Sequence, residues 1–252
     1  MRADAASRAQ RLLHAAESGA KGVAVTVGAP VKAAARAVKR HVPPQYTLGE
    51  EIANSITHGI GAALGVAALV VMIVKAPLPA RTPRRLRARS SSASLILEYL
   101  ASTLYHAIAP AAAKRVFRII DHSCIYVLIA GTYTPFCLIT LGEAGGIPLC
   151  IAVWALAIAG VLFEAFMRER QPHWLTAVMY VAMGWLVLFR LPQLIGALHP
   201  TALFLLAAGG LCYTIGAVFY VLKKIRYMHT VFHVWVLAGS VLQFLAVVLF
   251  VI

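Results

Sequence analysis

The chain has 252 residues, of which 61% are hydrophobic and only 13% are charged, a composition too apolar for a soluble domain or a disordered chain. Lys and Arg outnumber Asp and Glu by 23 to 9, for a formal net charge of +14. Because the basic residues lie in a polar N-terminus and between apolar runs, they indicate membrane topology and contact with anionic lipid, and we expect no binding of nucleic acid.

Residues 1–47 form an Ala-rich and basic segment at the start of the chain. We interpret it as a flexible cationic tail, and the alternative is an amphipathic helix that lies on a membrane surface. No apolar stretch in it has the length and the position of a secretory signal peptide. Residues 48–252 are expected to form one membrane domain.

Seven apolar stretches follow the tail, and a transmembrane helix needs about 20 such residues. The second stretch is short, and the Arg-rich segment 80–92 precedes it. The pattern predicts an all-α integral membrane protein, folded as a bundle of seven transmembrane helices. The predicted spans cover roughly 52–74, 94–110, 117–140, 146–166, 173–191, 203–222 and 229–252.

The basic residues between the spans predict a cytoplasmic N-terminus and an outside C-terminus. With this orientation, the outer loops after the third and fifth spans carry only Arg190. The loop 75–93 would also lie outside, yet it carries six basic residues and so argues against this orientation. An Ala- and Arg-rich composition is typical of a high-GC bacterium, so we expect the bacterial plasma (inner) membrane. The cytoplasmic loops carry Lys114, Arg115, Arg118, Arg168, Arg170, Lys223, Lys224 and Arg226.

This topology places polar side chains of four spans at the cytoplasmic leaflet, while the outer halves of the same spans are almost purely apolar. Ionisable groups inside a bilayer are costly, so each is a candidate functional residue. The group comprises Glu50, Glu51, Asn54 and His58 of the first span, Ser102 and His106 of the second, Asp121, His122 and Ser123 of the third, and His229 and His233 of the seventh. Their common depth predicts a functional site there.

The spacing of the histidines favours a metal site. His229 and His233 are four residues apart and share one helix face, and Ser102 and His106 have the same spacing. Three histidines and a water make the open tetrahedral arrangement of a catalytic zinc site, although Fe²⁺ or Mn²⁺ also suits these ligands. The alternative is that each histidine is an ordinary hydrogen-bonded residue at a helix end. The four cysteines form no Cys-x-x-Cys pair and are expected to be buried apolar side chains.

The motifs EEIANSITHG (50–59), STLYH (102–106), DHSCIY (121–126), GTYTPF (131–136) and HTVFH (229–233) resemble the signature blocks of bacterial hemolysin III proteins. These are similar to the progestin and adiponectin receptors and, more distantly, to alkaline ceramidases. The resemblance covers about residues 48–252 and implies seven helices with an intracellular zinc site. It implies His106, His229 and His233 as ligands, Asp121 as the residue that holds the zinc-bound water, and Ser102 as its catalytic neighbour. His122 neighbours Asp121 on another side of the helix and is not expected to be a ligand.

We expect a zinc-dependent hydrolase of a membrane lipid, with an amide bond as the favoured target. The alternatives are a membrane-active cytolysin and a metal-dependent receptor or sensor without turnover. Three positions depart from the family pattern: the Arg-rich segment 80–92, Gln243, where relatives often carry a histidine, and Glu98, where an apolar residue is expected. Glu98 lies one turn before Ser102; we expect it to face another helix, and the alternative is an extra acid near the metal.

Overall fold

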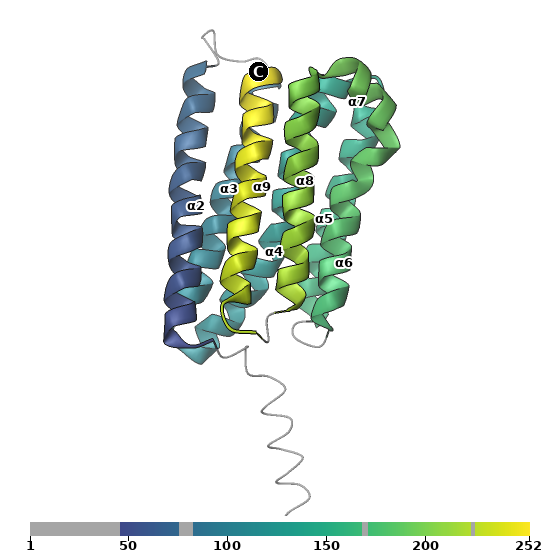
Figure 1. The fold of residues 1–252 in the computed structure, drawn as a ribbon. Coiled ribbons are helices and arrows are strands. Elements are labelled where there is room, and N and C mark those ends of the chain that lie inside the picture. Colours follow the sequence, from purple (N-terminus) through teal and green to yellow (C-terminus); the bar gives the residue numbers. More distant parts are fainter. Residues whose placement is uncertain (1–45, 76–82, 168–170, 223–224) are drawn as a thin grey trace, which may run out of the picture. The chain divides into compact units, whose positions relative to one another are not determined.

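The computed structural model describes residues 46–75, 83–167, 171–222 and 225–252, and within the second range it describes side chains from residue 89 onward. Every regular element in these ranges is a helix (Figure 1). The predicted basic tail, except for its last two residues, lies outside the described residues. So do residues 80–82 of the Arg-rich segment and the side chains of 83–88.

The helices follow one another with short connections. One π-helical segment, η1 (Phe136–Leu141), continues α4 after Pro135, and one 3₁₀ segment, η2 (Trp185–Arg190), joins α6 to α7. The α-helices are α2 (Leu48–Lys75), α3 (Pro83–Ala107), α4 (Ala111–Pro135), α5 (Gly146–Met167), α6 (His173–Gly184), α7 (Leu191–Ala197), α8 (Pro200–Val221) and α9 (Met228–Phe250).

Six helical segments among the described residues are long and apolar enough to cross a membrane, which confirms the prediction of an all-α membrane protein. Large apolar side chains such as Ile151, Phe166 and Phe204 are exposed on them, as expected of a surface that faces lipid. The six segments are Leu48–Lys75, Ala111–Leu141, Gly146–Met167, His173–Ala197, Pro200–Val221 and Met228–Phe250.

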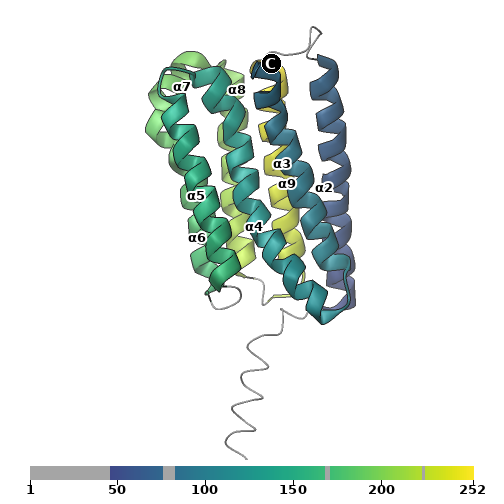
Figure 2. The ribbon, with the colours of Figure 1, turned by 180° about the vertical axis from the view of Figure 1, so that it is seen from behind.

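The helix α3 is longer than predicted and begins eleven residues earlier than the expected start at residue 94. The helix α3 is not among the six segments that are long and apolar enough to cross a membrane, so the seventh span remains a prediction. The helix nevertheless packs between α2 and α4 (Figure 2). Gly131 of α4 makes this close packing possible, because a Cβ atom there would overlap the Ser94 side chain of α3.

The first turn of α2 fixes the position of α9. Thr47 and Glu50 form a capping box, in which the Glu50 carboxylate accepts a hydrogen bond from the Thr47 amide at 2.9 Å and the Thr47 hydroxyl accepts one from the Glu50 amide at 3.3 Å. The other Glu50 oxygen accepts a hydrogen bond from the amide of Tyr227, the residue just before α9, at 2.9 Å. The starts of α2 and α9 and the end of α3 therefore lie at the same end of the bundle (Figures 1 and 2).

Candidate metal centre and adjoining cavity

Three buried histidines from two helices meet at this end of the bundle. His106 lies in the last turn of α3, and His229 and His233 lie in the first two turns of α9. Each offers a ring nitrogen within 4.8 Å of the other two, which no other group of His, Cys, Asp and Glu in the described part of the chain achieves. The Nε2 atoms of His229 and His233 are 3.1 Å apart. Two nitrogens bound to one tetrahedral ion at about 2.0–2.1 Å lie roughly 3.4 Å apart, so the pair is spaced to share a metal ion.

The carboxylate of Glu51 on α2 determines the orientation of the His106 ring. Its Oε2 lies 2.7 Å from His106 Nδ1, and its Oε1 pairs with Lys114 Nζ at 2.8 Å. A carboxylate can only accept a hydrogen bond, so the ring proton belongs on Nδ1 and the lone pair on Nε2. That Nε2 is buried and has no hydrogen-bond partner. A carboxylate behind a histidine with a free opposite nitrogen is the usual outer support of a metal ligand.

The ring of His233 is held in the same way by the backbone of α2. Its Nδ1 lies 3.3 Å from the carbonyl oxygen of Asn54 and 3.2 Å from the hydroxyl oxygen of Thr57. That hydroxyl donates to carbonyl oxygens of its own helix at 2.9 Å, so it can only accept from the ring. The proton of His233 therefore belongs on Nδ1, and Nε2 offers its lone pair toward His229. The Thr230 hydroxyl fixes Asn54 by donating to its Oδ1 at 2.5 Å.

Tyr46 lies two positions before α2, so it falls outside the predicted membrane domain. Its side chain nevertheless packs against the histidines. Its ring stacks on His229, with centroids 5.0 Å apart and planes at 22°, and lies 5.6 Å from the His106 ring. Burial raises the pKa of the Tyr46 hydroxyl well above its usual range, so the phenol stays neutral and can donate a hydrogen bond. Sequence reasoning assigned Tyr46 to the tail; the capping box that follows it was the signal that ordered structure begins there.

The predicted catalytic pair lies beside the histidines on α3 and α4. Ser102 is one helical turn from His106, and both Ser102 and Asp121 are buried; the Ser102 hydroxyl has no hydrogen-bond partner. Asp121 does not belong to the group of potential metal ligands. The charge of Asp121 also raises the pKa of Tyr46. The ring of Tyr46 in turn contacts two of the histidines. The catalytic roles of Asp121 and Ser102 stay predictions.

Two further histidines near the centre are held in other ways. His122 donates from Nδ1 to the Arg118 carbonyl at 2.8 Å and accepts from the Tyr220 hydroxyl at Nε2, at 3.0 Å. His58 stacks on His233 with ring centroids 3.5 Å apart and planes at 16°, and neither of its nitrogens has a hydrogen-bond partner. Neither residue belongs to the group of potential metal ligands among the described residues. His58 instead fixes the ring plane of His233.

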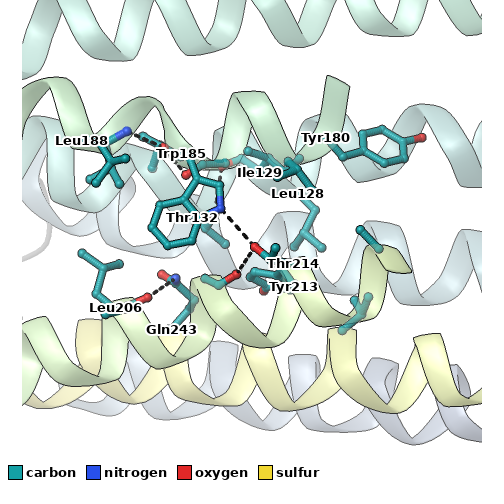
Figure 3. A pocket seen from close by; sticks show the side chains of 18 of the residues that line it. Leu128, Ile129, Thr132, Tyr180, Trp185, Leu188, Leu206, Tyr213, Thr214 and Gln243 are labelled. Atoms are coloured by element: carbon teal, nitrogen blue, oxygen red, sulfur yellow. Dashed lines mark hydrogen bonds between the residues drawn. The ribbon is translucent and has the colours of Figure 1, made fainter. Parts of the chain in front are cut away.

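A cavity of about 500 Å³ adjoins the histidines, lined mainly by α4, α6, α8 and α9. Its wall is largely apolar, with Leu128, Ile129 and Leu206 among the residues drawn in Figure 3. Phe232 of the cavity wall lies next to the centre, with its ring 5.4 Å from that of His229 and 5.7 Å from that of His233. Cavities of this size hold small molecules or lipid chains in proteins.

The sequence also made predictions about Glu98 and the four cysteines. Glu98, expected to face another helix, lines the cavity. The four cysteines carry free thiols; Cys124, Cys137 and Cys150 are buried as expected, whereas Cys212 is partly exposed.

The family model and the relatives that match this chain point to the same family. The model of the family described as haemolysin-III related matches residues 46–244. The chain is similar to the Hemolysin-3 homolog of Bacillus subtilis (strain 168), at 41% identity over 205 residues, which are 81% of this chain and 96% of the relative. It is also similar to the Hemolysin-3 of Bacillus cereus, at 41% identity over 203 residues, 81% of this chain and 92% of the relative.

Proposed function

Because the chain belongs to the haemolysin-III related family and gathers three buried histidines beside an apolar cavity, we propose that it is a zinc-dependent hydrolase of a membrane lipid. The observation that carries the proposal is the unpaired Nε2 of His106 in a residue that offers a ring nitrogen within 4.8 Å of those of His229 and His233. Three imidazoles without a thiolate suit Zn²⁺ and leave a fourth position for water or substrate.

The residues around the histidines have distinct parts in this reaction. When bound, Zn²⁺ supplies a Lewis acid that polarises the scissile carbonyl and lowers the pKa of water to about 7. Glu51 and the Asn54 carbonyl keep the ring protons of His106 and His233 on Nδ1. Asp121 accepts the proton of the attacking water as general base, and Ser102 positions its carboxylate.

The cavity supports a lipid substrate, and an amide bond is the favoured target. An acyl chain fits the apolar wall between α4 and α8, which places its carbonyl end near Phe232 and the histidines. Burying the chain in the bundle also excludes water from the reacting end, which strengthens the electrostatic interactions there.

We also propose the membrane arrangement in which this reaction takes place. The helix α3 acts as the seventh span, supported by its position between α2 and α4. The N-terminus is cytoplasmic and the C-terminus lies outside, in the plasma (inner) membrane of a bacterium. The metal centre then lies near the cytoplasmic face, where basic loops attract anionic lipid.

The test is hydrolysis of N-acyl lipids by the purified protein in lipid nanodiscs loaded with zinc. We expect release of the fatty acid by the wild type and a loss of at least a hundredfold in His233→Ala, while His199→Ala, which changes an exposed histidine, keeps full activity. Full turnover by a zinc-free His233→Ala protein would contradict the mechanism.

The name of the relatives suggests a second candidate, a membrane-active cytolysin. Release of dye from liposomes that persists in His233→Ala would favour it over the hydrolase. Zinc binding without turnover of any lipid would favour a metal-dependent sensor.

A further inference from the structure

Tyr46 brings a hydroxyl group to the metal centre that the proposed reaction does not use. Its ring stacks on that of His229 with centroids 5.0 Å apart and lies 5.6 Å from the ring of His106, so it contacts two of the three proposed ligands. The side chain is half-buried. Within the described part of the chain, its hydroxyl has no hydrogen-bond partner and is not one of the polar atoms that the protein encloses, so a ligand can reach it.

The charged groups that act on this hydroxyl belong to the metal centre. Burial raises the pKa of Tyr46 most, and the charges of Arg118, Asp121 and Glu51 act on it as well. Asp121 is the proposed general base, and Glu51 supports His106. Because such interactions weaken with distance, the hydroxyl lies close to the base as well as to the ligands.

Two other donors beside the histidines are engaged within the protein. Lys114 Nζ pairs with Glu51 at 2.8 Å. The Thr230 hydroxyl donates to Asn54 Oδ1 at 2.5 Å. A neutral phenol can donate a hydrogen bond, so Tyr46 brings an uncommitted donor to the centre.

We propose that the Tyr46 hydroxyl is a catalytic residue, which donates a hydrogen bond to the carbonyl oxygen of the substrate. This oxygen gains negative charge when water attacks the carbonyl carbon, and a donor placed beside developing charge lowers the barrier. Tyr46 keeps its proton throughout. The inference rests on the proposed function for the class of substrate, and it adds a contact between the carbonyl and the protein itself.

Titration calorimetry with decylphosphonate tests this contact without turnover. The tetrahedral phosphonate group carries negative oxygens, as the attacked carbonyl does. The zinc-loaded protein in nanodiscs is titrated with the compound, and empty nanodiscs give the blank. We expect Tyr46→Phe, which keeps a ring that can stack on His229, to bind the phosphonate about 10- to 100-fold more weakly than the wild type.

The control variant is Tyr227→Phe, which removes an exposed hydroxyl at the same end of the bundle and should keep the affinity of the wild type. The zinc content should stay at the wild-type level in both variants, because neither change removes a ligand or the stacked ring. In the hydrolysis assay, we expect Tyr46→Phe to lower kcat by about 100-fold and to leave KM nearly unchanged.

Equal affinities of the wild type and Tyr46→Phe for the phosphonate would overturn the proposal. So would a loss of zinc in Tyr46→Phe, which would make the hydroxyl a support of the metal site. A wild type that binds the phosphonate through Tyr46 but hydrolyses no lipid would contradict the proposed hydrolase and leave this contact standing.

Discussion

Glu51 makes one nitrogen of His106 available to a metal ion by holding the proton on the other. Its two carboxylate oxygens pair with His106 Nδ1 at 2.7 Å and with Lys114 Nζ at 2.8 Å. The ion pair with Lys114 fixes the carboxylate itself, so the ring is oriented before any metal arrives. Outer contacts of this kind orient the ligand ring and raise its basicity, and so contribute to metal affinity.

Replacing Glu51 should weaken zinc binding and leave the fold intact. We expect Glu51→Gln to lower the zinc affinity by about 10- to 100-fold, because a neutral amide holds the Nδ1 proton less firmly. Competition with a fluorescent chelator measures the affinity, and Glu143→Gln, which changes an exposed carboxylate, is the matched control. An affinity equal to that of the wild type would mean that Glu51 only pairs with Lys114.

The sequence predicted the three histidines because their chemistry is visible locally. The four-residue spacing of His229 and His233 sets one helix face, and membrane topology sets the common depth with His106. Tyr46 was missed because its stacking on His229 depends on how two distant helices meet. The direction of Glu98 was likewise decided by packing, since the two faces of α3 carry no difference in pattern that predicts a cavity.

The helix α3 shows how hydropathy alone misplaces an element. The predicted span began at residue 94, where the apolar run begins, but the helix begins at Pro83. Arg and Ala are good helix formers, and Pro is favoured in a first helical turn, so the helix extends through a segment that reads as a loop on a hydropathy scale. The fifth predicted span, 173–191, ended too early, since the apolar segment continues to Ala197 as α6, η2 and α7.

The contact between α3 and α4 should be sensitive to a single methyl group. We expect Gly131→Ala to destabilise the protein by about 1–3 kcal/mol, because the new Cβ overlaps the Ser94 side chain. Gly196→Ala is the control, since apart from its chain neighbours and the nearby backbone of its own helix no atom lies within 4 Å of its Cβ position. The thermal midpoint in detergent measures both changes, and equal midpoints for the two variants would show that α3 and α4 are packed less closely.

The number of spans determines on which side of the membrane the C-terminus lies. Seven spans place the two termini on opposite sides, whereas six spans without α3 place them on the same side. With a cytoplasmic N-terminus, we expect alkaline phosphatase fused after residue 252 to be active and a fluorescent protein fused there to be dark. The reverse result, with fluorescence and no phosphatase activity, would show that α3 does not cross the membrane.

The function proposed for this protein depends on the binding of one metal ion by the three histidines. Mass spectrometry of the protein purified in mild detergent tests it directly, with His229→Ala/His233→Ala and His199→Ala analysed in parallel. We expect about one zinc per chain in the wild type and in His199→Ala, and none in the double variant. A folded wild type without metal, or a double variant that retains its zinc, would contradict it.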